Sequence, residues 1–283
     1  TSDNRGQVRV YKYDANKTTA QWDDQSLSNY GPVGWNRLGA DIDGKAVGDQ
    51  SGYSVSLSSD GTIVAIGATN NDENGNNAGH VRVYKYDTNT NSWSQLGGDI
   101  DGEAANDQSG RSVSLSADGT IVAIGAPYND GNGSNSGQVR VYKYDANNNS
   151  WNRVGADIDG EAADDNLGIS VSLSADGTIV AIGATRNDAS GNLLADAGHV
   201  RVYKYDATKT TAQLANQSLA NYGPVGWNRL GGDIDGEAAG DYSGQSVSLS
   251  SDGTVVVIGA PYNDGTTGNT SDNRGHVRVY KYQ

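Results

Sequence analysis

The sequence predicts an all-β protein: a β-propeller-like array of about four four-stranded antiparallel blades, with one spare terminal strand. Three observations support this fold class. The strand-like segment VRVYKY occurs five times, starting at Val8, Val81, Val139, Val200 and Val277. The turn-like segment Asp-Gly-Thr occurs four times, starting at Asp60, Asp118, Asp176 and Asp252. No window shows the i, i+3, i+4, i+7 apolar spacing of an amphipathic helix.

Each repeat is expected to contain four short strands, which the second repeat illustrates in chain order. Residues 111–116 (RSVSLS) alternate small and apolar side chains, as a strand with one buried face does. Residues 120–126 (TIVAIGA) are apolar on both faces and predict a fully buried strand. Residues 138–144 (QVRVYKY) alternate again, and residues 151–158 (WNRVGADI) form the fourth strand. Asp, Asn and Gly residues separate the segments, so consecutive strands are expected to pair as hairpins.

The repeats fill the whole chain as a single repeat domain. Their approximate bounds are 1–50, 51–108, 109–166 and 167–242, with 243–283 completing the first repeat. Near-identical inserts occupy residues 17–34 and 209–226. If the strands of a blade are labelled a to d, the chain begins c-d and ends a-b-c. A closed four-blade ring would therefore leave one c strand spare, and an open array of the same sheets is the alternative.

The composition excludes several classes of function. The chain has 34 Asp and Glu against 20 Lys and Arg, and this surplus of acid argues against nucleic acid or an anionic membrane surface as partner. The absence of Cys excludes disulfides, thiolate metal sites and a cysteine nucleophile. No apolar stretch reaches the length of a membrane-spanning helix. Since no catalytic motif is present either, we expect that the protein is not an enzyme.

Acidic residues cluster where the fourth strand of each repeat ends in Asp-Ile-Asp-Gly. In three repeats, four acids follow at a spacing familiar from calcium loops. These candidate Ca²⁺ ligands are Asp99, Asp101, Glu103 and Asp107; Asp157, Asp159, Glu161 and Asp165; and Asp233, Asp235, Glu237 and Asp241. The first repeat has Lys45 at the Glu position, which would weaken a site there. The alternative is that the acids cap turns and pair with the strand residues Arg82, Arg140, Arg201 and Arg278.

Other side chains recur at fixed repeat positions. The His position holds His80, His199 and His276, but Gln7 and Gln138 elsewhere, so a polar strand-start residue is favoured over a metal ligand. One Trp position holds Trp35, Trp93, Trp151 and Trp227, and packing between blades is favoured over a sugar-binding platform. Within the inserts, apolar side chains are candidate contacts for a partner. They are Trp22, Tyr30 and Tyr222.

Each repeat also carries the pattern x-G-x-S-V-S-L-S-x-D-G-T-x-V-x-I-G-A-[PT], beginning at Ser51, Ser109, Leu167 and Ser243. This pattern resembles the FG-GAP repeat of integrin alpha-chain propellers and many bacterial surface proteins. The resemblance implies a secreted or surface-exposed propeller used for adhesion or binding. The Phe of the family motif is Ser or Leu here, and the family's calcium loop is shortened to Asp-Gly-Thr. That calcium site is therefore not carried over to this chain.

These features together predict an extracellular or cell-surface structural or adhesive repeat protein. We expect it to self-associate as an oligomer or filament, or to bind surface proteins or glycans. The chain begins and ends with near-identical segments containing VRVYKY, and an unpaired copy can pair with another molecule. The candidate contact residues of these strands are Val8, Val10, Val277 and Val279. The alternative function is a calcium-dependent, lectin-like carbohydrate-binding module.

Overall fold

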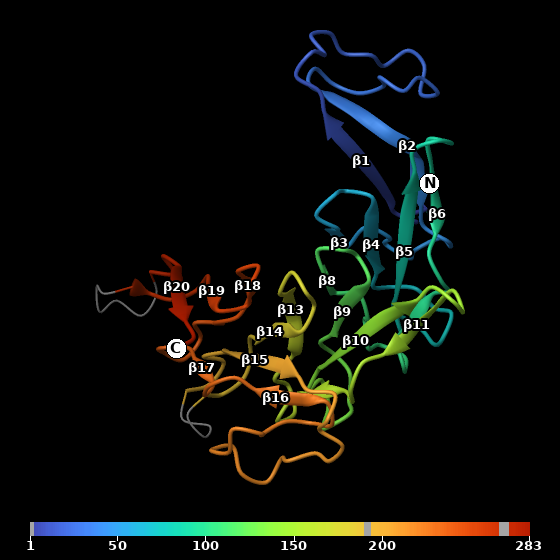
Figure 1. Cartoon of the computed structure of the whole chain (residues 1–283). Coiled ribbons are helices and arrows are strands. Elements are labelled where there is room, and N and C mark those ends of the chain that lie inside the picture. Colours follow the sequence, from blue (N-terminus) through green and yellow to red (C-terminus); the bar gives the residue numbers. More distant parts are fainter. Residues whose placement is uncertain (1–2, 190–193, 266–271) are drawn as a thin grey trace.

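The computed structural model describes residues 3–189, 194–265 and 272–283, and within these ranges the regular elements are strands, with no α-helix. Five antiparallel sheets follow one another along the chain and form an open arc (Figure 1). The predicted all-β blade array is thus confirmed, and within the arc its two end sheets lie apart. In the described part of the chain, no helix has the length and apolarity needed to span a bilayer.

The sheets at the two ends of the arc are incomplete. The first pairs β1 (Gln7–Tyr13) with β2 (Trp35–Asp43). The last has the order β18-β19-β20, formed by β18 (Ser246–Leu249), β19 (Val255–Ala260) and β20 (His276–Lys281). The first sheet therefore holds the third and fourth strands of a blade, whereas the last holds the first three.

Three complete blades lie between these ends. The first contains β3 (Ser54–Leu57), β4 (Ile63–Ala68), β5 (His80–Asp87), β6 (Ser92–Gln95) and β7 (Ile100–Asp101). The second contains β8 (Ser112–Leu115), β9 (Ile121–Ala126), β10 (Gln138–Asp145), β11 (Ser150–Arg153) and β12 (Ile158–Asp159). The third contains β13 (Leu167–Leu173), β14 (Ile179–Ala184), β15 (His199–Tyr205), β16 (Trp227–Arg229) and β17 (Ile234–Asp235).

The fourth strand of each complete blade differs from the prediction, because it is broken into two pieces. In the second blade, β11 and β12 both pair with β10, but the chain between them leaves the sheet. Gly155 lies in this break with φ of 70°, a left-handed conformation that interrupts an extended strand. The four-stranded blade is therefore correct, and its last strand carries a glycine-centred interruption.

Neighbouring blades pack through apolar faces on the second and third strands. Val81 and Val83 of β5 are fully buried in a cluster with Val122 and Ile124 of the next blade. A glycine near the end of each second strand allows the blades to approach closely. A Cβ atom at Gly125 would lie 2.0 Å from the Gly168 carbonyl oxygen of the following blade, a distance that no side chain tolerates.

The Asp-Gly-Thr segments form the tight turns between the first and second strands. In the second blade, the Asp118 carboxylate accepts hydrogen bonds from the Thr120 amide at 2.9 Å and from the Ser116 hydroxyl at 2.6 Å. In the last sheet, the equivalent hydrogen bonds from Ser250 and Thr254 lower the pKa of Asp252 to about 2. The prediction that these acids are turn residues, rather than remnants of a calcium loop, agrees with this geometry.

Candidate functional site

A buried histidine and three carboxylates converge at the boundary between the first two sheets. His80 begins β5, Glu73 lies in the loop after β4, and Asp99 and Asp101 flank Ile100. The His80 Nδ1 atom lies 3.7 Å from Asp99, 3.8 Å from Glu73 and 4.0 Å from Asp101. Burial lowers the pKa of His80, so its imidazole is neutral at pH 7. Burial also raises the pKa of Asp101. We call these four residues the His80 cluster.

The Lys45 side chain reaches this cluster from the preceding sheet. Its ammonium group forms an ion pair with Glu73 and lies 3.0 Å from Asp99. Lys45 and Glu73 are both departures from the repeat pattern, because the other repeats have Glu where Lys45 stands, and Gly or Ala where Glu73 stands. This paired exchange of charge was visible in the sequence, but it links residues 28 positions apart in different loops.

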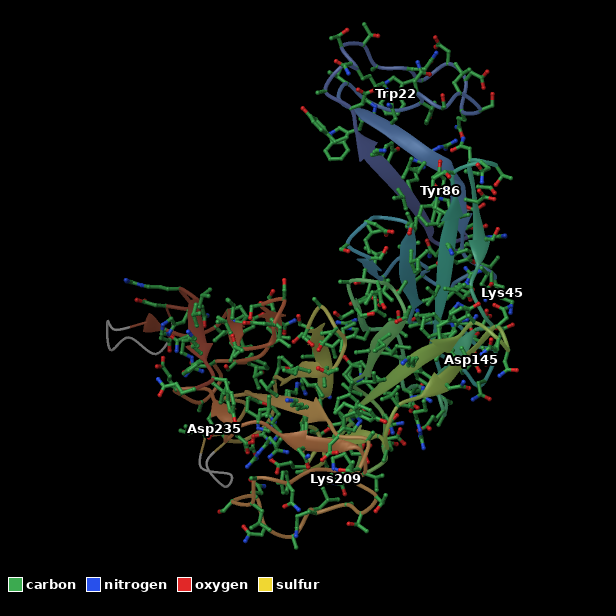
Figure 2. The ribbon with its side chains drawn as sticks, viewed as in Figure 1. Trp22, Lys45, Tyr86, Asp145, Lys209 and Asp235 are labelled. Carbon is green, nitrogen blue, oxygen red and sulfur yellow. The ribbon has the colours of Figure 1, made fainter. Side chains whose placement is uncertain are left out.

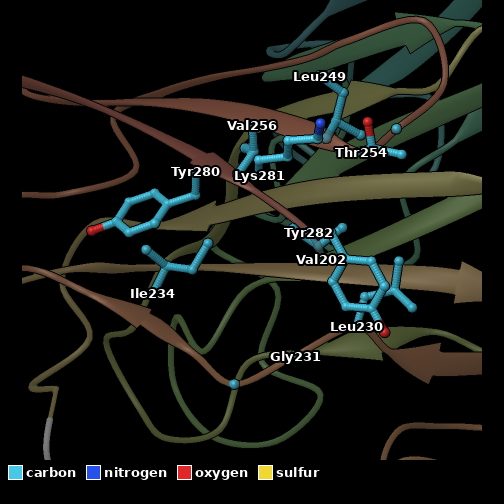
Figure 3. Close-up of a pocket in the computed structure, with 12 residues that line it drawn as sticks. Val202, Leu230, Gly231, Ile234, Leu249, Thr254, Val256, Tyr280, Lys281 and Tyr282 are labelled. Atoms are coloured by element: carbon cyan, nitrogen blue, oxygen red, sulfur yellow. The ribbon is translucent and has the colours of Figure 1, made fainter.

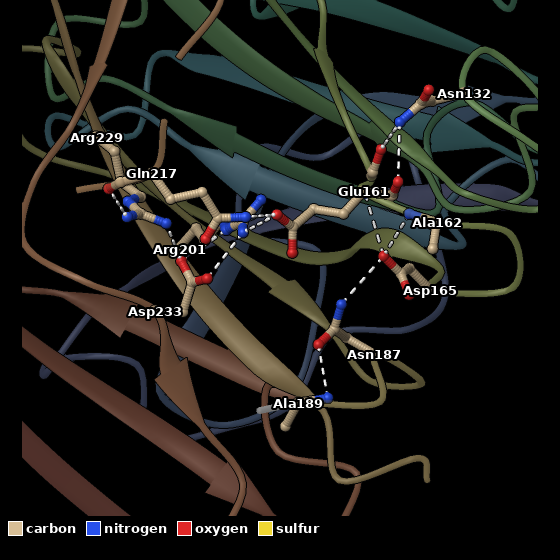
Figure 4. A network of polar contacts seen from close by, with 11 residues as sticks. Asn132, Glu161, Ala162, Asp165, Asn187, Ala189, Arg201, Gln217, Arg229 and Asp233 are labelled. Atoms are coloured by element: carbon tan, nitrogen blue, oxygen red, sulfur yellow. Dashed lines mark hydrogen bonds and ion pairs between the residues drawn. The ribbon is translucent and has the colours of Figure 1, made fainter. Parts of the chain in front are cut away.

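The equivalent position two interfaces later along the arc, between the second and third complete blades, is filled by arginine pairs. Arg201 donates two hydrogen bonds to Asp233 at 2.7 and 2.8 Å and also pairs with Glu161 (Figure 4). Arg229 forms a further ion pair with Asp233. His199 lies beside Glu161 and Asp233, and burial lowers the pKa of His199 to about 3. The charge of these carboxylates is therefore already balanced by protein cations.

The predicted calcium sets do not come together as sets of four. Among the described residues, only two groups place three or more potential metal ligands within 4.8 Å of one another: the His80 cluster, and Glu161 with His199 and Asp233. Asp101 and Asp99 belong to the first group, but Glu103 instead lies 3.4 Å from Arg140. The sequence pattern therefore indicated an acidic, potentially metal-binding region, but not which residues share one site.

The remaining predicted ligands take the roles of the alternative interpretation. Asp107 accepts hydrogen bonds from the Ala104 amide at 3.0 Å and from the Asn129 side chain at 2.9 Å. Asp165 and Asp241 cap the equivalent turns. The other acids pair with strand side chains: Asp157 with Arg153, Asp159 with Gln138, and Glu237 with His276 and Arg278. Asp235 lies in β17 and pairs with His199 in the strand register.

The recurring Trp side chains connect neighbouring blades, as predicted. The indole nitrogen of Trp93 donates to the Leu38 carbonyl at 2.7 Å, that of Trp151 to Leu96 at 2.7 Å, and that of Trp227 to Val154 at 3.2 Å. Each indole covers the glycine that follows its acceptor. Trp35, in the incomplete first sheet, is the exception, because its side chain is 45% exposed. The three engaged Trp side chains do not form a sugar-binding platform.

The insert residues divide into exposed and buried side chains. Trp22 is 53% exposed and lies in the loop beyond β1 and β2, at one end of the arc (Figure 2). Tyr30 and Tyr222 are only 9% and 6% exposed, so the prediction that they project as contact residues is wrong. The reason is that a lysine folds each insert back. Lys209 donates to the carbonyl groups of Gly223 at 2.9 Å and Trp227 at 2.7 Å, and this fold buries Tyr222.

The valines of the two terminal third strands have opposite environments. Val8 and Val10 are buried against Val64 and Ile66, so they belong to the core of this chain and are not free contacts. Val277 and Val279 are each 64% exposed, although the equivalent valines of β5 are fully buried. The last sheet thus presents an apolar face that a following blade covers elsewhere in the arc.

A small apolar pocket of about 150 Å³ lies next to this last sheet (Figure 3). Leu230, Gly231, Val202 and Tyr282 are among its lining residues. Leu230 and Gly231 are the repeat equivalents of the residues that receive the Trp indoles in the other blades. No atom lies within 4 Å of a Cβ placed on Gly231, whereas a Cβ on Gly97 would meet Trp151 at 2.7 Å. We call this pocket the empty Trp seat.

Three stretches of the chain match a known family of repeats. Residues 40–84, 100–142 and 235–280 match the family model described as FG-GAP repeat. No curated protein matches the sequence. Similar solved structures include hydrazine synthase from Kuenenia stuttgartiensis, at 16% identity and a TM-score of 0.48, where the match covers 85% of this chain and 60% of that one. Another is a proposed 6-phosphogluconolactonase from Bacteroides fragilis, at 12% identity and a TM-score of 0.47, with 81% and 49% covered. The chain therefore spans less than two thirds of either protein.

Proposed function

Because this chain is an FG-GAP-like repeat protein, we propose that it is an extracellular structural or adhesive protein that self-associates head to tail through its two incomplete sheets. One observation carries the proposal: the last sheet lacks a fourth strand, and the first sheet contains a fourth strand paired to a copy of the same third strand. An end that lacks a strand and an end that can supply it are complementary in a heterologous, chain-forming contact.

The sequence identity of the third strands sets the register of this contact. In the first sheet, Lys12 pairs with Asn36 and Tyr13 pairs with Trp35. β20 has the same VRVYK sequence, and within the described residues its only strand partner is β19. β2 of a second copy can therefore pair with β20 in the register it uses with β1. Lys281 then takes the place of Lys12 opposite Asn36.

The empty Trp seat supports the same arrangement. When β2 of the second copy pairs with β20, its Trp35 stands where the indole of a fourth strand belongs, beside Leu230 and Gly231. The exposed indole and the apolar pocket would then bury each other. In this strand exchange, β2 leaves β1 of its own chain and pairs with β20 of another copy. Burial of an aromatic side chain contributes about 1.5–3 kcal/mol, which favours the exchanged pairing.

The exposed valines of β20 complete the fit. In the second copy, β20 would replace β1 over β3 and β4, so that Val277 and Val279 cover Val64 and Ile66. Within one chain, Val8 and Val10 provide this cover. After the exchange, β20 thus restores the cover that β1 gives Val64 and Ile66 in the single chain. The burial of Trp35 is a further contact that the single chain lacks.

Light scattering of the purified full chain over a range of concentrations tests the proposal. We expect the mass to rise with concentration for the wild type, and Val279→Glu to remain a folded monomer, because its side chain is exposed in the single chain. Val33→Glu is the matched control, since Val33 is 56% exposed in an insert, and it should associate normally. A wild type that stays monomeric up to about 100 μM, a concentration at which a contact of about 5.5 kcal/mol is half populated, would overturn the proposal.

A second candidate function, the lectin-like module, has one supporting observation. A cavity of about 390 Å³ lies beneath the second insert, lined by Tyr203, Tyr222, Asp157, Glu161 and Arg201 among others. Tyrosine faces, carboxylates and an arginine are groups that contact sugar rings and hydroxyls in binding sites. A glycan array probed with and without Ca²⁺ tests this candidate. Binding that Tyr222→Ala abolishes would support it, and an array without signal would reject it.

A further inference from the structure

We infer that the His80 cluster is a binding site for a divalent transition-metal ion such as Zn²⁺, with Glu73, His80, Asp99 and Asp101 as ligands. All four ligands belong to the blade of β3 to β7, and the site faces Lys45 of the preceding sheet. It shares two acids with the predicted calcium sets, but its other ligands and its ion are different.

The buried imidazole is the strongest indication that this cluster binds an ion. His80 is fully buried, and both of its ring nitrogens lack a hydrogen-bond partner. One oxygen of Asp101, 4.0 Å from Nδ1, is also buried without a partner. Buried polar atoms are nearly always paired in folded proteins, and an unpaired one is strongly destabilising. An ion between these atoms would satisfy the Nδ1 and the carboxylate oxygen together.

The spacing of the donor atoms fits an ion with short bonds. Zn²⁺ binds imidazole nitrogen and carboxylate oxygen at about 2.0–2.2 Å in a tetrahedron, which places two ligand atoms roughly 3.3–3.5 Å apart. The observed separations from Nδ1 are 3.7, 3.8 and 4.0 Å. The three carboxylates therefore need to approach Nδ1 by only a few tenths of an ångström, and all four ligand atoms already lie within 4.8 Å of one another.

The donor set favours a transition metal over calcium. One imidazole nitrogen with three carboxylates provides a ligand number and type that suit Zn²⁺ or Co²⁺. Ca²⁺ requires six to eight oxygen ligands and rarely accepts nitrogen. The fully buried imidazole also restricts the number of additional water ligands that a larger ion would need.

When no ion is bound, the positive charge of Lys45 balances part of the negative charge of the His80 cluster. Its ammonium group pairs with Glu73 and Asp99, and the 47% exposure of its side chain leaves it free to swing into solvent when a metal ion enters. Removing this competing cation should strengthen metal binding. The contrasting group at Glu161, His199 and Asp233 lacks this freedom, because Arg201 is 2% exposed and cannot leave.

Titration calorimetry on the chelator-treated full chain tests the inference, with ZnCl₂ and CaCl₂ as separate probes. We expect one Zn²⁺ to bind per chain, with at least tenfold preference over Ca²⁺. His80→Gln, which copies the residue at position 138, should weaken Zn²⁺ binding more than tenfold, and Lys45→Ala should strengthen it. His276→Gln is the matched control, because His276, in the last sheet, is exposed and, among the described residues, pairs with one carboxylate only, that of Glu237.

A spectroscopic measurement distinguishes this site from scattered surface binding. Co²⁺ added to the wild type should give the intense visible absorption of a tetrahedral ion, and Lys45→Ala should give it at lower Co²⁺ concentration. Circular dichroism confirms that each variant is folded. Loss of Zn²⁺ binding in His276→Gln, unchanged binding in folded His80→Gln, or no Zn²⁺ binding by the wild type would each overturn the assignment.

Discussion

Replacement of Trp227 by Ala tests how the blades are held together. Trp227 is fully buried, its indole packs against Gly155, and its indole nitrogen donates to the Val154 carbonyl of the preceding blade. Truncation of a buried Trp costs about 3–5 kcal/mol, through reduced burial and the cavity that remains. The Val154 carbonyl is also left without its partner, which places the expected destabilisation toward the upper end of this range.

Trp35 provides a matched control at the same repeat position. Its side chain is 45% exposed in the single chain, and Trp35→Ala should lower the free energy of unfolding of the monomer by less than about 1 kcal/mol. Urea unfolding followed by circular dichroism, at a concentration where the chain is monomeric, measures both variants. If the two variants are destabilised equally, the recurring Trp residues do not join neighbouring blades.

Three further predictions follow from the same packing and hydrogen bonds. Gly125→Ala should destabilise the fold by about 1–3 kcal/mol, because its Cβ would meet Gly168, whereas Gly98→Ala points into open space and should be neutral; thermal melts of both decide this. Arg201→Ala should cost about 1.5–3 kcal/mol, because the buried guanidinium pairs with Glu161 and Asp233 and only Asp233 keeps a second cation, Arg229, while Arg9→Ala, whose guanidinium is 44% exposed, should cost less than about 1 kcal/mol in urea unfolding. The turn residues Asp60, Asp118, Asp176 and Asp252 have a pKa below the unfolded value, so their stabilisation is present above about pH 4 and is lost as pH falls toward 2; Asp118→Asn should flatten the melting-temperature profile in that window, and an unchanged slope would contradict the assignment.

The repetition of the sequence made much of the fold predictable. A segment such as TIVAIGA, apolar on both faces, has only one satisfactory environment, which is a strand between two other sheets. The Asp-Gly-Thr turns and the Trp position recur in phase, so their structural roles could be assigned once for all repeats. The break in the fourth strand was missed because a glycine such as Gly155 is compatible with a bulge inside a continuous strand as well.

The candidate site was less predictable, because its residues come from several loops. Regular spacing in Asp99, Asp101, Glu103 and Asp107 resembled one calcium loop, yet the chain turns direct these carboxylates to different neighbours. Glu73 comes from the loop between β4 and β5, and only tertiary structure shows that it meets Asp99 and Asp101 beside His80. Tyr30 and Tyr222 likewise became buried through lysine contacts that the sequence pattern does not reveal.

Disulfide trapping at the two incomplete sheets tests the central proposal most directly, because the chain contains no other cysteine. A chain carrying both Lys281→Cys and Asn36→Cys has one thiol on β20 and one on β2, at positions that become opposite when the strands of two copies pair. We predict that mild oxidation produces a ladder of covalent oligomers on a non-reducing gel, while either single variant produces none. A monomer with an internal disulfide, which would mean ring closure within one chain, or a chain with both thiols still free, would contradict head-to-tail association.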